Sequence, residues 1–307
     1  MRVTVTGATG MLGRPLVDEL LDRGDEVTVL TREAASAERL FGGRAIAATW
    51  SDPKGERPPP DSVSGRDGVI HLLGEPVAQR WTGDARREIR DSRVLATRNL
   101  VAALRELPDG DRPKVLVSQS ASGFYGPRGD EPVTESEPAG DDFLARVCVE
   151  WEAEASAASD LGPRIALTRT GVVLADSGGA LEKMLPPFKL GVGGPVAGGR
   201  QYMPWIHTDD VVGALIFCLD NAAAEGPLNL AAPEPVTNAE LSKTLGRVLR
   251  RPAFAPVPAL AVKALYGEMA QIVTTGARAV PSRLLELGYE FREPDLERAL
   301  ELATGKR

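Results

Sequence analysis

The sequence predicts an α/β protein: a Rossmann-type, doubly wound parallel sheet with a small, mainly helical C-terminal lobe on the substrate side. A short apolar strand pattern runs directly into a glycine-rich turn and then a helical pattern within the first 21 residues. Strand and helix patterns alternate through the first two-thirds of the chain, which is typical of parallel sheets. From Thr237 the pattern is mostly helical and is broken by prolines.

The glycine turn is the first functional signal. Val3 and Val5 mark a buried strand, and Gly7, Gly10 and Gly13 follow at regular spacing. Gly7 permits a tight turn, Gly10 lets a pyrophosphate approach the backbone, and Gly13 allows close packing of helix on strand. The phosphates would bind the free N–H groups at the helix N-terminus. The turn therefore predicts dinucleotide binding, and the alternative is a βα turn without a ligand.

The remaining elements follow from apolar periodicity. We expect strands at residues 2–6, 26–30, 45–48, 68–73, 114–119 and 164–168, and helices at 33–40, 84–107 and 142–158. Residues 51–66 carry four prolines and are predicted to form a loop in place of a crossover helix. Residues 127–141 are acidic and rich in proline and glycine, which favours an active-site loop.

The composition changes near Gly178, where a glycine-rich loop region begins. Strand and helix patterns return over Ile206–Leu219. We therefore assign residues 1–178 and 205–230 to an NADP-binding domain. The substrate-side lobe is assigned to residues 179–204 and 231–307, because ligands of open α/β sheets lie over the carboxyl ends of the strands.

Composition narrows the class of partner. The chain has 307 residues, of which 43% are hydrophobic, and a formal net charge of −7. This charge disfavours nucleic acid and anionic membranes and favours a small-molecule substrate. Two cysteines and two histidines at wide spacing predict neither a disulfide framework nor a metal site, and they fit a reducing cytoplasm. The N-terminus enters a strand at once, so no leader segment is expected.

The end of the second strand indicates which dinucleotide is bound. Thr31 stands where an NAD-selective site usually has a carboxylate for the ribose 2′-hydroxyl, and Arg32 supplies a guanidinium that suits a 2′-phosphate. Glu33 competes for the carboxylate role but is expected to start a helix. The sequence therefore favours NADP(H), with a solvated surface role for Arg32 as the alternative.

Several motifs resemble the extended, epimerase-like branch of the short-chain dehydrogenase/reductase superfamily, and within it an epimerase-family subgroup with a distinctive C-terminal domain. The matching stretches are 71–74, 80–82, 92–93, 120–126, 142–144, 151–152, 169–174 and 204–210, together with Pro281, Leu284, Gly288 and Phe291. The resemblance covers essentially the whole chain.

The resemblance implies a set of cofactor contacts. These are Gly7, Thr9, Gly10, Met11, Leu12 and Gly13 at the pyrophosphate, Thr31 and Arg32 at the adenosine phosphate, Leu72, Leu73 and Gly74 at the ribose and adenine, and Glu88, Arg93, Ser118 and Val173 elsewhere, with Val173 at the nicotinamide. The alternative for Glu88 and Arg93 is an ion pair with each other on a solvated helix face.

The catalytic pattern of the superfamily is incomplete. Its extended members use a Ser or Thr on the fifth strand and a Tyr-x-x-x-Lys pair, whose lysine lowers the pKa of the tyrosine. Ser120 fills the serine position, but the helix over 142–158 contains neither Tyr nor Lys. Standard chemistry of the superfamily is therefore not predicted.

Other residues are candidates for the missing roles. Tyr125 is a candidate proton donor, with packing against the nicotinamide as its alternative, and Cys148 is a candidate acid that we expect to be buried and inert. Arg200 and His207 are candidate substrate contacts, with a surface arginine and a histidine near a helix cap as their alternatives. Arg146 supplies a charge but carries no transferable proton.

Three functions remain open. The first is an NADP(H)-dependent, epimerase-family oxidoreductase with nonstandard acid/base residues. The second is a non-catalytic NADP(H)-binding regulatory or partner-binding protein. The third is a sugar-nucleotide epimerase or dehydratase. We expect a monomer or a homodimer, since dimers of the superfamily often pair through the two long helices.

Overall fold

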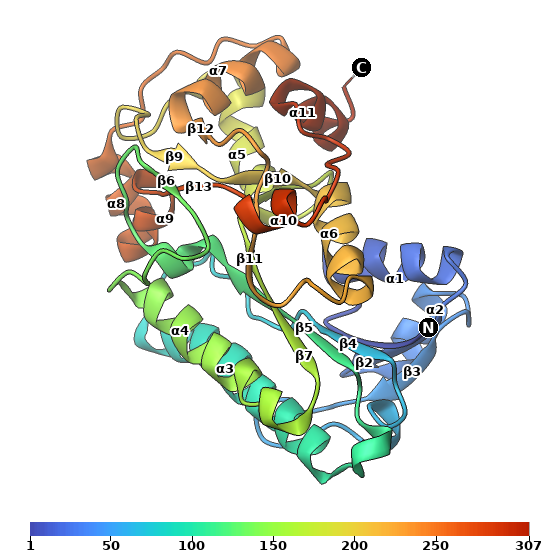
Figure 1. Ribbon diagram of the computed structural model, residues 1–307. Helices are drawn as coiled ribbons and strands as arrows, with labels where there is room; N and C mark the ends of the chain where they lie inside the picture. The colour runs from blue at the N-terminus through green and yellow to red at the C-terminus, as the bar shows by residue number, and fades with distance from the viewer. Residues whose placement is uncertain (307) are drawn as a thin grey trace.

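The computed structural model describes residues 1–306 and contains a seven-stranded parallel sheet (Figure 1). Its strands are β1 (Arg2–Thr6), β2 (Glu26–Thr31), β3 (Ile46–Thr49), β4 (Gly68–His71), β5 (Val115–Ala121), β7 (Arg164–Thr170) and β11 (Gly226–Leu230). The spatial order is β3-β2-β1-β4-β5-β7-β11. The predicted fold class is confirmed, and the six predicted strands agree with the structure to within two residues at each end.

The strand register places the ends of three strands together. Thr6 at the end of β1 is opposite Leu30 of β2 on one side and His71 of β4 on the other. The strand order reverses between β1 and β4, and ligands of open parallel sheets bind at such a switch point. The glycine turn, the Thr31 end of β2 and the segment after His71 therefore leave the sheet at the same edge.

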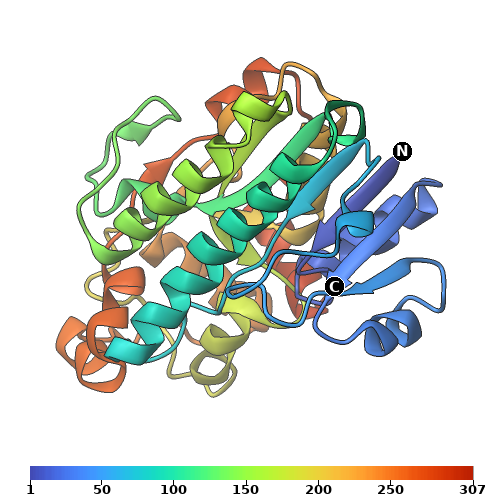
Figure 2. The same ribbon diagram turned by 90° about the horizontal axis from the view of Figure 1, so that it is seen from below.

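Helices cover both faces of the sheet. On one face α1 (Gly13–Asp22) and α6 (Thr208–Asp220) share a core, and on the other α3 (Gly83–Glu106) packs with α4 (Phe143–Ser156). Figure 2 shows α3 and α4 side by side across the sheet. The helix α2 (Ala34–Leu40) lies against β2 and β3. The predicted helices are thus confirmed, each within two residues at either end.

The proline-rich segment 51–66 contains only the short 3₁₀ turn η1 (Pro60–Ser62), so the predicted loop is confirmed. Further 3₁₀ turns are η2 (Asp109–Asp111), η3 (Ser122–Tyr125), η4 (Ser159–Leu161) and η5 (Gly267–Ala270).

Three two-stranded sheets lie outside the main sheet. They pair β8 (Val172–Leu174) with β10 (Trp205–His207), β9 (Tyr202–Met203) with β12 (Val236–Thr237), and β6 (Pro132–Val133) with β13 (Arg278–Ala279). The helices of the C-terminal region are α5 (Gly179–Lys189), α7 (Asn238–Leu249), α8 (Ala259–Tyr266), α9 (Gln271–Thr274), α10 (Ser282–Glu286) and α11 (Leu296–Thr304). A core that includes Leu181, Leu245 and Leu300 joins α5, α7 and α11.

Within residues 1–306, no helix combines the length and the apolar character needed to cross a bilayer. The same residues contain no group of three or more His, Cys, Asp or Glu side chains arranged to hold a metal ion.

Candidate functional site

A cleft of about 700 Å³ opens at the carboxyl ends of the central strands. It is lined by the glycine turn, the segment after β4, the end of β5, one side of α4, and residues 271–277 of the C-terminal region. The predicted site residues that line it are Gly7, Gly10, Met11, Leu12, Gly13, Leu72, Leu73, Gly74, Arg93, Ser120 and Val173. The structure thus brings most of the predicted cofactor contacts together in one cavity.

Only glycine fits at two positions of the turn. Gly7 has a φ of +67°, and a Cβ at Gly7 would lie 2.9 Å from the carbonyl oxygen of Leu72. A Cβ at Gly13 would lie 2.2 Å from the carbonyl oxygen of Gly7, because helix and strand pack so closely there. The Gly10 N–H donates to the Gly7 carbonyl at 3.0 Å and closes the turn.

The N-terminus of α1 is open to an anion. No side chain caps this helix, and its first turn contains no acidic residue. Within the described residues, the backbone N–H groups of Met11 and Leu12 donate to no protein acceptor. By contrast, Thr82 caps α3 and Asp142 caps α4. Since free N–H groups and the helix dipole both favour negative charge, this end suits the phosphates of a dinucleotide.

The end of β2 provides a cation near this edge. Arg32 is exposed and makes no hydrogen bond or ion pair within residues 1–306. Glu33 is the N-cap residue of α2, which confirms that a helix starts there, and its carboxylate accepts a hydrogen bond from the Ser36 hydroxyl at 3.1 Å. Thr31 accepts from the Glu33 N–H at 3.4 Å. Thr31 and Arg32 lie outside the cleft lining, and so does the exposed Thr9.

Arg93 enters the cleft wall from α3. Its Nη1 donates to the carbonyls of Glu75 and Ile89, each at 2.9 Å, and its guanidinium lies 5.2 Å from the Trp151 ring centroid. A Cβ at Gly74 would lie 2.9 Å from the guanidinium carbon, so Gly74 makes room for this side chain. Removal from water lowers the pKa of Arg93.

A buried histidine links the turn to α3. Thr97 donates to the Arg93 carbonyl at 2.7 Å, so its hydroxyl oxygen accepts from His71 Nε2 at 3.0 Å. His71 Nδ1 then accepts from the Thr6 hydroxyl at 2.8 Å, which assigns the neutral Nε2–H tautomer. Burial lowers the pKa of His71 to about 3. The sequence showed His71 only as part of a motif.

Behind Ser120 lies a buried ion pair that sequence reasoning missed. The Ser120 hydroxyl donates to Oε1 of Glu152 at 2.6 Å, and Arg169 Nε and Nη2 donate to the two oxygens of that carboxylate at 2.9 Å each. All three residues are buried. The register of β5 and β7 places Arg169 opposite Ser120, and knowledge of that register would have predicted the contact.

Neither Cys148 nor Tyr125 offers a proton donor to the cleft, as expected for Cys148 but not for Tyr125. Cys148 lines the cleft one helical turn before Glu152, but burial raises the pKa of its thiol to about 12, as expected for an inert cysteine. Tyr125 lies outside the cleft lining and is fully buried. Its hydroxyl donates to Asn229 at 2.7 Å and accepts from Arg169 at 3.1 Å. The structure therefore corrects both readings of Tyr125, because the ring is sealed in a polar network beneath the cleft.

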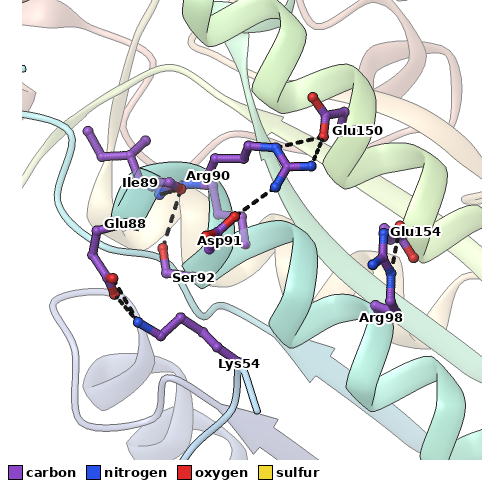
Figure 3. A network of polar contacts seen from close by, with 10 residues as sticks. Lys54, Glu88, Ile89, Arg90, Asp91, Ser92, Arg98, Glu150 and Glu154 are labelled. Carbon is purple, nitrogen blue, oxygen red and sulfur yellow. Dashed lines mark hydrogen bonds and ion pairs between the residues drawn. The ribbon is translucent and has the colours of Figure 1, made fainter. Parts of the chain in front are cut away.

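Four further predicted contacts also lie outside the cleft lining. Glu88 forms no pair with Arg93; it binds Lys54 of the 51–66 loop at 2.7 Å and points away from α4 (Figure 3). Ser118 is buried in β5, and its hydroxyl has no partner within residues 1–306. Arg200 is exposed. His207 is the N-cap of α6, where its Nδ1 accepts from the Asp209 N–H at 3.2 Å. His207 thus agrees with its alternative, a histidine at a helix cap.

Comparison with known proteins agrees with this geometry. The model for the NAD dependent epimerase/dehydratase family matches residues 3–231, and a model for a domain of unknown function matches residues 257–303. The chloroplastic "Epimerase family protein SDR39U1 homolog" of Arabidopsis thaliana is 40% identical over 98% of this chain and 86% of its own length.

Two solved structures are similar over nearly the whole chain. The crystal structure of human epimerase family protein SDR39U1 with NADPH has a TM-score of 0.86 and 35% identity, covering 99% of each chain. A Corynebacterium glutamicum protein described as a nucleoside-diphosphate sugar epimerase has a TM-score of 0.77 and 33% identity, covering 99% of this chain and 58% of the other.

Proposed function

The chain belongs to the NAD-dependent epimerase/dehydratase family, and we propose that it is an NADP(H)-binding oxidoreductase whose acid/base group is not a Tyr-x-x-x-Lys pair. One observation carries the proposal: a tight glycine turn and an uncapped α1 N-terminus lie at the same sheet edge as the unpaired Arg32. The human relative that was crystallised with NADPH supports it.

The chain's own residues hold the cofactor as follows. The N–H groups at the start of α1 bind the pyrophosphate, and Arg32 binds the 2′-phosphate through charge-assisted hydrogen bonds. Leu72, Leu73, Gly74 and Arg93 line the dinucleotide, and Val173 lies toward the nicotinamide. When bound, the nicotinamide supplies or accepts a hydride.

Ser120 and Glu152 are our proposed proton carriers. The Ser120 hydroxyl donates its hydrogen to Glu152. The lone pairs of Ser120 Oγ are therefore available to accept a hydrogen bond from a ligand in the cleft. A substrate hydroxyl gives its proton to Ser120 Oγ while Ser120 passes its own hydrogen to Oε1 of Glu152, and reduction reverses both transfers. Arg169 holds the carboxylate in place through two N–H groups.

Replacing Arg32 tests the cofactor assignment. We expect Arg32→Ala to weaken NADPH binding by about tenfold to a hundredfold, the value of a lost hydrogen bond to a charged group, and to leave NADH binding unchanged. Calorimetric titration measures both. Arg39→Ala, which removes an exposed arginine from the neighbouring α2, is the control and should leave both affinities unchanged. Equal loss of NADPH and NADH affinity would remove Arg32 from the site.

A non-catalytic NADP(H)-binding protein is the second candidate. It is favoured by the protonated Cys148 thiol on α4 and by the sealed Tyr125 of η3, neither of which offers an ordinary proton donor to the cleft. Ser120→Ala decides between them once a substrate is found, because it should abolish NADPH oxidation and spare NADPH binding. Unchanged turnover in Ser120→Ala would exclude the proposed relay.

A further inference from the structure

We infer that the substrate of this cleft is a small, uncharged and largely apolar molecule that carries a hydroxyl or carbonyl group, and that it is not a nucleoside-diphosphate sugar. The inference rests on the proposed function, since it concerns the part of the cleft beyond the cofactor. It follows from the apolar walls of that part and from the balance of positive and negative side chains along the cleft.

The walls between α4 and the C-terminal region are mainly apolar. Their apolar side chains are Trp81, Leu144, Val147, Met203 and Ile272, and the polar residues Tyr202, Gln271 and Thr275 line the same part. Trp81 donates its only N–H to the carbonyl of Val77 at 2.9 Å, so its ring offers a ligand carbon surface alone. The ring is held edge-on to Phe143 with centroids 5.1 Å apart, and the Arg86 guanidinium lies over both rings. A rigid apolar wall of this kind binds through burial of carbon surface.

Four charged side chains line the whole cleft, two of each sign: Glu75, Arg93, Asp142 and Lys183. Arg93 donates to two backbone carbonyls and packs against Trp151. Lys183 is exposed and donates to the carbonyl of Ala78. A diphosphate is bound best by several cations or N–H groups that act together. Arg93 and Lys183 come from different helices, α3 and α5, and the carboxylates of Glu75 and Asp142 balance their charge. The cleft lining therefore carries no net positive charge to attract a diphosphate.

Asp142 contributes a carboxylate to the wall of the cleft beside the substrate part. Asp142 accepts from the Ala145 N–H at 2.9 Å as the cap of α4, and from Gln271 of α9 at 2.8 Å. A phosphate brought beside Asp142 would meet like charge in a partly desolvated place, which disfavours binding. An uncharged ligand meets no such penalty.

The C-terminal wall of the cleft is held in place by contacts within the protein, without any contribution from a bound anionic ligand. Gln271 binds Asp142, Thr275 donates to the Gln271 carbonyl at 2.8 Å, and Arg86 of α3 forms an ion pair with Glu268 of η5. The apolar cavity is thus preformed and does not need a charged ligand to close it.

Binding of two probes tests the inference. The NADPH-saturated protein is titrated calorimetrically with 2-naphthol, a small uncharged apolar alcohol, and separately with UDP-glucose. We expect saturable 2-naphthol binding and no UDP-glucose binding. Ile272→Lys should weaken 2-naphthol binding at least tenfold by placing a charge in the wall, and Leu144→Lys serves the same purpose should Ile272→Lys not fold. Leu260→Lys, at an exposed leucine of α8 outside the cleft lining, is the control and should change nothing.

Saturable UDP-glucose binding would overturn the inference, and its loss in Lys183→Met would show that Lys183 binds the diphosphate. Absence of 2-naphthol binding would overturn it too. The cofactor-free protein is titrated with 2-naphthol in parallel. Failure of NADPH binding with 2-naphthol binding retained would contradict the proposed function and leave the substrate class standing.

Discussion

The two sides of the cleft are built on different principles. On the β1–β4 side the site consists of backbone: a glycine turn, free N–H groups and a helix end. On the β5–α4 side it consists of side chains, namely Ser120 backed by the buried pair of Glu152 and Arg169. The backbone side keeps the pattern of the superfamily, whereas the side-chain side has lost the Tyr-x-x-x-Lys pair.

This difference shows which part of such a site is free to change. A turn with a Cβ clearance of 2.2 Å admits only glycine, so its sequence is restricted by sterics. A buried side-chain cluster requires only that charges and hydrogen bonds be satisfied, which different residues achieve. The cofactor role can therefore persist while the acid/base chemistry differs.

The largest expected effect lies on the side-chain side. Glu152→Ala leaves the Arg169 guanidinium buried without its partner, and loss of one member of a buried pair costs about 3–5 kcal/mol of unfolding free energy. Glu154→Ala, two residues further along α4, breaks a surface pair with Arg98 at 2.5 Å and should cost about 0–1 kcal/mol. Chemical denaturation compares them. Equal losses would show that the buried cluster is not structural.

On the backbone side, Gly13→Ala places a Cβ against the Gly7 carbonyl. We expect a loss of about 1–3 kcal/mol from overpacking and loss of NADPH binding, because the turn must shift. Gly110→Ala has no atom within 4 Å of the new Cβ and is the matched control. Thermal denaturation and NADPH titration measure the two effects. Undisturbed NADPH binding in Gly13→Ala would mean that the turn does not hold the cofactor.

His71 makes the backbone side sensitive to acid. Its pKa falls from about 6.5 when unfolded to about 3 when folded, so the unfolded chain binds more protons between these values. Stability should therefore fall by about 1.4 kcal/mol for each pH unit below 6.5 and level off near pH 3. The slope of unfolding free energy against pH for wild type should exceed that of His71→Gln by this amount. Parallel slopes would contradict the buried neutral imidazole.

The smallest expected effect is that of replacing Glu88, which tests whether the cofactor site extends to this residue. Glu88→Gln removes the exposed pair with Lys54, which should cost at most about 1 kcal/mol of stability. NADPH affinity should change less than twofold, because Glu88 does not line the cleft. Calorimetry measures the affinity. A loss greater than twofold would support the cofactor contact that the family resemblance implied for Glu88.

The same contrast explains what the sequence could and could not predict. The glycine turn and the strand ends were predictable because glycine spacing and apolar periodicity report backbone geometry directly. The cleft residues 72–74 were implied by the family resemblance. The partnership of Ser120 with Glu152 and Arg169 was not predictable, since it depends on the β5–β7 register and on which face α4 turns inward. The buried partners of Tyr125 were not predictable, because a polar side chain near a site gives no sign of what it bonds to, whereas His207 follows its stated alternative of a histidine at a helix cap.

The most direct test of the central claim is a calorimetric titration of the nucleotide-stripped wild-type protein with NADPH, NADP⁺ and NADH in parallel. We expect NADPH and NADP⁺ to bind about tenfold to a hundredfold more tightly than NADH, because only they carry the 2′-phosphate that Arg32 would bind. Equal affinity for all three nucleotides, or no binding of any of them, would contradict the proposed NADP(H) site.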